Sequence, residues 1–118
     1  MLKDNVCYQK AFNYSIKIVK LHKKLKKDKN EYVMSKQLLK CGTSIGANLK
    51  EGIHGQSRKD FIAKFSISLK EAEETEYWLD LLKKTGYINK EKHKKLKEDL
   101  KEIIKIIVSS IKTAKENI

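Results

Sequence analysis

The sequence has no proline and only five glycines among its 118 residues. Both residue types interrupt helices, because proline lacks the amide hydrogen that a helix needs and glycine loses the most backbone freedom on folding. The chain can therefore run in long, uninterrupted helices. No apolar run approaches the roughly 20 residues that span a bilayer, and the amino-terminal end lacks the apolar region of a signal peptide. We therefore expect a cytoplasmic protein with no membrane partner.

Residues that hold metals or attack substrates are also scarce. Cys7 and Cys41 lack the spacing of a metal site, and we expect a pair of reduced thiols. His22, His54 and His93 fall on three different elements, and none is paired with a second metal ligand at a recognised spacing. The Glu-x-x-His motifs of di-metal bundles, phosphate-binding glycine loops and nucleophile motifs are missing as well. The sequence thus predicts no cofactor, no metal site and no enzymatic activity.

Apolar periodicity and helix-breaking residues predict four helices. They are expected at about residues 4–27, 31–53, 57–85 and 89–117. Ser57 and Asn89 are the expected amino-terminal caps of the third and fourth helices, and Gly86 is expected to end the third. All connections are short, which favours antiparallel neighbours. The predicted fold is all-α: one domain, residues 1–118, forming an antiparallel up-down-up-down four-helix bundle.

Two glycines lie one helical turn apart in the second predicted helix. Gly42 and Gly46 have Ser44 and Ala47 beside them, so this face carries only small side chains. In a water-soluble bundle such a face favours the close packing of one helix on another over a ligand cleft.

Lysine is abundant and unevenly placed. The chain has 27 basic and 15 acidic residues, for a formal net charge of +12. Residues 17–40 hold nine lysines and two acidic residues, and residues 78–97 hold seven lysines and two acidic residues. The remaining sequence is balanced, so these two segments carry the whole net charge. An up-down-up-down bundle brings both segments to one end, here called the basic pole, which would attract polyanions and nucleic acid first of all.

The candidate nucleic-acid-binding residues are fourteen of the sixteen lysines in these two segments, all except Lys36 and Lys40. They are Lys17, Lys20, Lys23, Lys24, Lys26, Lys27, Lys29, Lys83, Lys84, Lys90, Lys92, Lys94, Lys95 and Lys97. Few stacking aromatics lie near them, with Tyr32 and Tyr87 flanking the two turns. That scarcity favours phosphate contact with RNA or DNA over base-specific readout. The alternative is a structural or adaptor protein that binds a protein partner and uses its lysines only for solubility.

The first and fourth predicted helices are apolar over a wider arc than a core requires. At about 100° per residue, the apolar side chains between Phe12 and Leu25 and between Ile103 and Ile111 each cover roughly 200°. A core-facing stripe needs little over half of that width, so the excess favours self-association over scattered surface residues. The candidate oligomer-interface residues are Ile18, Leu21, Ile106 and Val108.

Two motifs in the middle of the chain carry a family resemblance. The run that begins at Gln37 reads QLLKCGTSIGAN, and the predicted third helix starts with QSRKDF at Gln56. Over about residues 8–113 the chain resembles the family first recognised as open reading frames inside intervening sequences of bacterial 23S ribosomal RNA genes. The resemblance implies an antiparallel four-helix bundle that assembles as a ring-like homopentamer, and it implies no settled biochemical activity. A more distant branch contains accessory proteins of diversity-generating retroelements, which partner a reverse transcriptase and bind nucleic acid.

The chain departs from the family pattern at three positions. Cys41 stands where a serine is usual, and Glu73 and Asp80 stand where relatives often carry arginine. The two acidic residues argue against phosphate contact along that flank of the third helix. They leave the lysines of the basic pole untouched.

Overall fold

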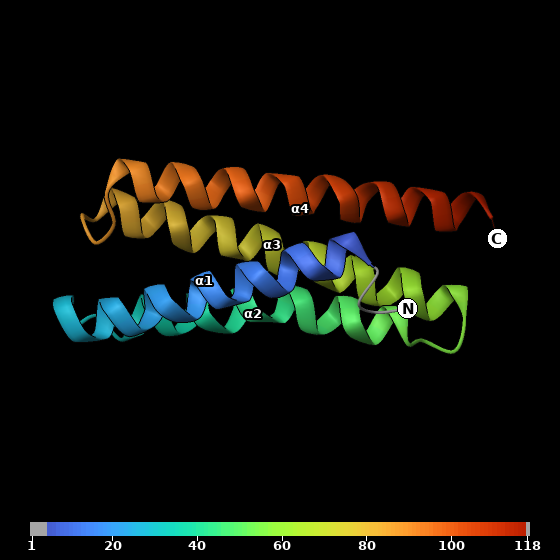
Figure 1. The fold of residues 1–118 in the computed structure, drawn as a ribbon, viewed down its shortest axis with the longest axis horizontal. Coiled ribbons are helices and arrows are strands. Elements are labelled where there is room, and N and C mark those ends of the chain that lie inside the picture. The colour runs from blue at the N-terminus through green and yellow to red at the C-terminus, as the bar shows by residue number, and fades with distance from the viewer. Residues whose placement is uncertain (1–4, 118) are drawn as a thin grey trace.

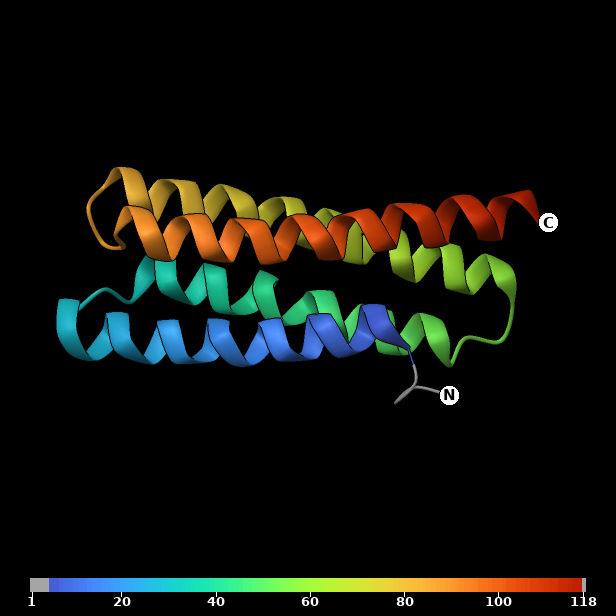
Figure 2. The same cartoon turned by 45° about the horizontal axis from the view of Figure 1, so that its top comes forward.

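The computed structural model describes residues 5–117, and this part of the chain forms four helices and no strand. The helices are α1 (Val6–Lys29), α2 (Val33–Ile53), α3 (Arg58–Lys84) and α4 (Lys90–Glu116). They run up-down-up-down in an elongated bundle with extents of 47 × 22 × 19 Å (Figures 1 and 2). The predicted all-α, antiparallel four-helix bundle is confirmed.

The predicted helix caps form hydrogen bonds that explain where α3 and α4 begin. The Ser57 hydroxyl accepts from the Asp60 amide at 3.1 Å, and the Asn89 side chain accepts from the Lys92 amide at 2.8 Å. Each cap satisfies an amide that has no partner inside its helix. Beyond α3, Gly86 has a φ of +86°, the left-handed conformation that glycine adopts without steric cost.

The first connection differs from the prediction by two residues on each side. Helix α1 continues to Lys29, because Asn30 takes the left-handed conformation (φ 54°) that ends it. Glu31 does not begin α2; its carboxylate turns back and accepts hydrogen bonds from the backbone amides of the first three residues of that helix at 2.7–3.2 Å. Glu31 is therefore a buried cap. The predicted start of the first helix at residue 4 lies outside the described residues.

Helices α1, α3 and α4 bury residues at alternating spacings of three and four. On α1 these seam positions are Cys7, Ala11, Tyr14, Ile18, Leu21 and Leu25. On α3 they are Phe65, Ser68, Ala72, Thr75, Leu79 and Leu82, and on α4 they are Leu96, Leu100, Ile103 and Ile107. This alternation is the heptad pattern of left-handed helical bundles, in which every seam residue faces the neighbouring helices.

The small face of α2 packs against α1, as predicted, although its two glycines differ. A methyl group on Gly42 would lie 2.9 Å from Cγ2 of Ile18, inside the contact distance of two carbons. A methyl group on Gly46 would lie 3.6 Å from Ala11, which is an ordinary contact. Helix α1 therefore lies too close to α2 for a side chain at position 42, where glycine is required. At position 46 the spacing would also admit alanine.

Candidate nucleic-acid interface

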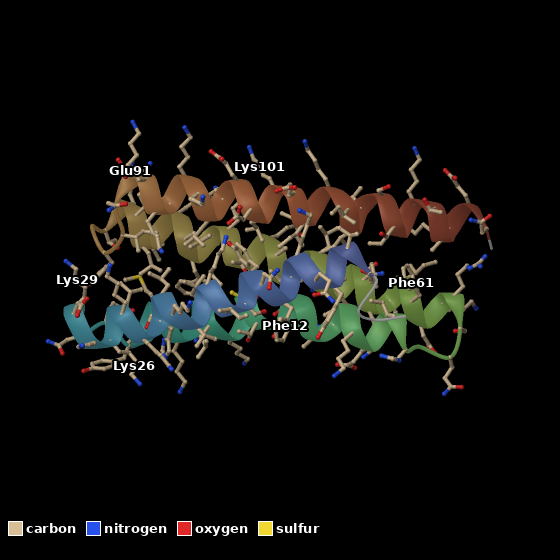
Figure 3. All side chains as sticks on the ribbon, in the orientation of Figure 1. Phe12, Lys26, Lys29, Phe61, Glu91 and Lys101 are labelled. Atoms are coloured by element: carbon tan, nitrogen blue, oxygen red, sulfur yellow. The ribbon has the colours of Figure 1, made fainter. Side chains whose placement is uncertain are left out.

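The two lysine-rich segments lie at the same end of the bundle. The α1–α2 and α3–α4 turns sit side by side at the left of Figure 1, opposite the α2–α3 turn. In Figure 3, Lys26 and Lys29 project from the end of α1, and Glu91 marks the start of α4 at the same end. The topology thus gathers lysines that are some sixty residues apart in the sequence into one surface.

Most lysines of the basic pole have no acidic partner. Two of the fourteen candidates are ion-paired: Lys17 lies 2.8 Å from Asp99, and Lys97 lies 2.8 Å from Asp80 and 3.3 Å from Glu76. The other twelve are exposed and form no ion pair with an acidic residue that the structure describes. They are Lys20, Lys23, Lys24, Lys26, Lys27, Lys29, Lys83, Lys84, Lys90, Lys92, Lys94 and Lys95. Their charges are available to an anionic ligand.

The acidic residues of the same segments do little to neutralise this surface. The Glu31 carboxylate is buried against backbone amides of α2. Asp80 is paired with Lys97 and also contacts His93 at 2.7 Å. Asp28 and Glu91 are exposed among the twelve lysines and form no ion pair within the described chain. The positive potential of the pole is therefore not cancelled locally.

A cleft of about 490 Å³ opens at the basic pole between the end of α1 and the α3–α4 turn. Its apolar lining comes from Leu21, Leu25, Tyr87 and Ile88, and its polar lining comes from Lys24, Asp28, Lys29, Asn89 and Lys92. Gly86 completes the wall, and a side chain there would meet nothing within 4 Å. The cleft thus combines an apolar interior with a mainly cationic edge.

A second hollow continues from this cleft along the α1–α4 seam. It has a volume of about 390 Å³ and shares Asn89 and Lys92 with the first. Its other lining residues are Lys17, Glu91, Lys95 and Leu96. Farther along, the seam is bridged by ion pairs from Lys17 to Asp99 and from Lys10 to Glu102, the latter at 3.0 Å. Inside it, the Tyr14 hydroxyl donates to the Leu96 carbonyl at 3.0 Å.

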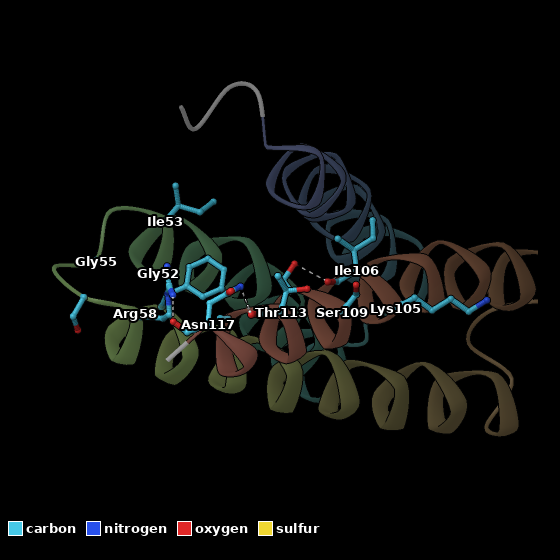
Figure 4. A pocket seen from close by; sticks show the side chains of 13 residues that line it. Gly52, Ile53, Gly55, Arg58, Lys105, Ile106, Ser109, Thr113 and Asn117 are labelled. Atoms are coloured by element: carbon cyan, nitrogen blue, oxygen red, sulfur yellow. Dashed lines mark hydrogen bonds between the residues drawn. The ribbon is translucent and has the colours of Figure 1, made fainter.

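The opposite end of the bundle, here called the open end, carries a larger groove of about 900 Å³. Figure 4 shows Arg58 and Asn117 together at one end of this groove and Lys105 at the other. The groove exists because the seam of α4 continues beyond Ile107 with small residues. Its lining residues are Gly52, Ile53, Gly55, Ser57, Arg58, Phe61, Lys105, Ile106, Ser109, Ser110, Thr113, Ala114 and Asn117.

The predicted oligomer-interface residues divide into two groups. Ile18 and Leu21 are only 0% and 4% exposed, so their prediction is wrong: they occupy seam positions inside a single chain. Val108 is 48% exposed, and Ile106 lines the groove at the open end. The exposed apolar residues of α1 lie beside the seam instead: they include Val6 at its start, and Phe12 and Ile16, which are 50% and 42% exposed. The three-four spacing of the apolar residues in the sequence could have separated Phe12 and Ile16 from the seam residues Ile18 and Leu21.

Both cysteines of the described chain lie in the core. Burial raises the pKa of Cys7 and of Cys41 to about 11, so both thiols stay protonated and unreactive at neutral pH. Between residues 5 and 117, no three side chains of the metal-ligating types gather closely enough to hold an ion. None of the four helices there combines the length and apolar character needed to cross a membrane.

These features define a class of protein: a small antiparallel four-helix bundle with one strongly basic end. The family described as "23S rRNA-intervening sequence protein" matches residues 3–109, and the chain belongs to this family. The chain is also similar to a protein of unknown function from the S23 ribosomal protein family of Bacteroides thetaiotaomicron VPI-5482, whose crystal structure is solved. The two share 50% sequence identity with a TM-score of 0.89, over 91% of this chain and 99% of that one. No curated protein matches the chain.

Proposed function

We propose that this protein is a non-enzymatic, cytoplasmic homo-oligomer that binds RNA or DNA through backbone phosphates at the basic pole. The observation that carries the proposal is the set of twelve exposed lysines gathered around two adjacent turns, none of them ion-paired with an acidic residue between residues 5 and 117. Surface lysines that serve only solubility are commonly interspersed with acidic residues. Those of the pole are concentrated at one end, which favours a polyanionic ligand.

If the lysines contact phosphates, the affinity for nucleic acid must depend on the salt concentration. Each phosphate that a lysine neutralises releases condensed counterions, so the affinity falls as the salt concentration rises. The steepness of that fall reports how many lysines take part. Because compact ammonium groups supply these contacts, we expect little preference among base sequences.

The test reverses equal numbers of charges at the pole and on the body. One variant changes Lys23, Lys24, Lys26 and Lys27 to glutamate, and the control changes Lys101, Lys105, Lys112 and Lys115. Fluorescence anisotropy with a structured RNA and a DNA duplex at several salt concentrations should show a loss of affinity and a shallower salt dependence for the pole variant. The control should lose distinctly less, although its net charge is the same. Equal losses from both variants would contradict the proposal.

We further propose that the protein assembles, as a pentameric ring if it follows its family resemblance. The half-buried Ile106 and the exposed Val108 on α4 supply apolar surface for this contact. Light scattering after size exclusion should give a mass several times 13.7 kDa. Ile106→Glu combined with Val108→Glu should lower this mass while the circular dichroism remains helical. Val33→Glu, at an exposed position of the basic pole, is the control and should leave the mass unchanged. A monomeric wild type at micromolar concentration would contradict the assembly.

The groove at the open end favours a second candidate function, an adaptor that binds a protein partner such as a reverse transcriptase. The groove offers apolar surface with Arg58 and Lys105 at its two ends and contains no acidic lining residue. A partner helix with an apolar face and acidic ends would fit it. If the wild type bound neither nucleic acid at low salt, this candidate would replace the first.

A further inference from the structure

We infer that the cleft at the basic pole receives one unpaired nucleotide of the bound strand. The protein should therefore prefer nucleic acid with an unstacked base over a fully paired duplex. This inference rests on the proposed function and adds the form of the ligand. It does not depend on how the protein assembles.

The lining of the cleft is the first reason. A surface that only contacts phosphates needs exposed cations and no hollow. This cleft has an apolar floor in which Leu21, Leu25 and Ile88 are buried, with the half-buried ring of Tyr87 beside them. The part of the Tyr87 ring that remains exposed offers a surface against which a base can pack its flat π-face, above the apolar floor. A base inside a duplex cannot reach the floor, because its faces are covered by its neighbours in the stack.

Size and charge are the second reason. The volume of about 490 Å³ is sufficient for one base together with its sugar. Around it stand Lys24, Lys29 and Lys92 against the single acidic residue Asp28, so the edge is net positive. Phosphates on either side of an inserted base would fall at this edge. The cleft therefore offers the two groups of a nucleotide, an apolar face and an anion, to matching surfaces.

The neighbouring hollow shows where the strand would continue. It shares Lys92 with the cleft and adds Lys95, which has no acidic partner in the described chain, and Glu91, so its lining is still net positive. Beyond it, Lys17 is already paired with Asp99, and the Lys10–Glu102 pair closes the seam farther on. The cationic path is thus short. It fits one inserted nucleotide with its adjoining phosphates, and it offers no track for a long single strand.

The experiment compares three fluorescent RNA probes of the same sequence: a blunt duplex, the same duplex with one bulged nucleotide, and the single strand. Anisotropy at fixed low salt should show that the wild type binds the bulged duplex and the single strand more tightly than the blunt duplex. Tyr87→Ala should reduce binding to the bulged probe by about fivefold or more, the lower end of what one stacked base contributes. Its effect on the blunt duplex should be small.

Matched variants separate the cleft from its surroundings. Tyr32→Ala removes an exposed aromatic ring from the other turn of the same pole, outside the cleft, and should leave the preference for the bulge unchanged. Lys24→Glu and Lys23→Glu change the net charge equally on neighbouring exposed residues, but only Lys24 lines the cleft. Only the Lys24 variant should lose the preference. This pair keeps the test valid even if Tyr87→Ala fails to fold.

The outcomes distinguish the inference from the proposed function. Salt-dependent binding that is equal for blunt and bulged duplexes would overturn the inference and leave phosphate binding at the pole intact. A similar loss from Lys23→Glu and Lys24→Glu on the bulged probe would also overturn it. No binding of the wild type to any probe would overturn both.

Discussion

The two ends of the bundle are built on the same seam and differ in what fills it. At the basic pole, large side chains such as Leu25, Leu82 and Leu96 occupy the seam almost to the turns, and each is no more than 2% exposed. At the open end, the seam of α4 continues with Ser110 and Ala114, and a groove of about 900 Å³ remains. A periodic pattern thus fixes which face of a helix turns inward, whereas side-chain volume decides whether that face is packed or hollow.

The two ends also differ in surface chemistry: the lysines lie at the basic pole, and the apolar groove lies at the open end. The pole has buried leucines beneath a lysine-rich surface, and the cleft that opens there is the smaller of the two. The open end has an apolar groove with few charges, where Arg58 donates to the backbone carbonyl of Asn117 and ties the start of α3 to the end of α4. A ligand that recognises charge and one that recognises apolar surface would therefore bind at opposite ends.

The largest expected effect tests the packing contrast directly. Leu82→Ala at the pole removes a fully buried side chain and should destabilise the fold by about 2–5 kcal/mol, through lost burial and the cavity left behind. Ile106→Ala in the groove removes a half-buried side chain and should cost less than half as much. Chemical denaturation monitored by circular dichroism measures both. Equal costs would mean that the two ends are packed alike.

A smaller effect is expected along α2, which runs from one end to the other. Gly42→Ala places a methyl group 2.9 Å from the buried Ile18 and should destabilise by about 1–3 kcal/mol through overpacking, partly offset by better helix propensity. Gly46→Ala meets Ala11 at 3.6 Å, so only the propensity gain of up to about 1 kcal/mol should appear. Thermal melting should therefore shift in opposite directions. A rise for both variants would contradict the close contact at Gly42.

The smallest expected effect concerns acid. Burial raises the pKa of Asp80, but hydrogen bonds from Lys97 and His93 outweigh burial and leave that pKa below its ordinary value. The ion pair therefore stabilises the fold above the ordinary aspartate pKa, and this contribution is lost as the pH falls through the lowered value. Because Asp80 is 52% exposed, the contribution is about 1 kcal/mol or less after solvent screening.

Melting temperatures of the wild type and of Asp80→Asn, measured over a pH series, test this link. The wild type should be slightly more stable at neutral pH, and the difference should vanish in acid. The Arg58–Asn117 contact at the open end involves a backbone carbonyl and does not titrate, so it supplies the contrast. A difference that persists at the lowest pH would show that Asp80 acts by packing.

Local chemistry made most of the fold predictable. Ser57, Asn89 and Gly86 are residue types with a strong preference for the cap positions that they occupy, so the ends of α3 and α4 were predicted to within one residue. The first connection was less predictable. Glu31 has good helix propensity, but its carboxylate contributes more as a cap on three free amides than as a member of the helix.

The sites were predictable only where they depend on topology. The gathering of lysines at one end follows from antiparallel helices and short turns. The assignment of Ile18 and Leu21 to an interface failed because both apolar arcs were treated as continuous, although the three-four spacing separates seam residues from their neighbours. The groove at the open end depends on the small side chains of Ser110 and Ala114, and the wall of the cleft at the basic pole includes Gly86. Composition gives no direct signal for either feature.

The hydrogen bonds of Glu31 have a consequence for the electric field of the whole molecule. The amides that the Glu31 carboxylate faces carry partial positive charge, which offsets part of its field, so it opposes the lysines beside it less than an exposed carboxylate would. In a body 47 Å long with a balanced remainder, charge concentrated at one end produces a large dipole moment along the bundle axis. Such a dipole exerts a torque on the protein near a polyanion and turns the basic end toward it before contact. The cap of one short turn thus helps to set the orientation in which the protein meets its ligand.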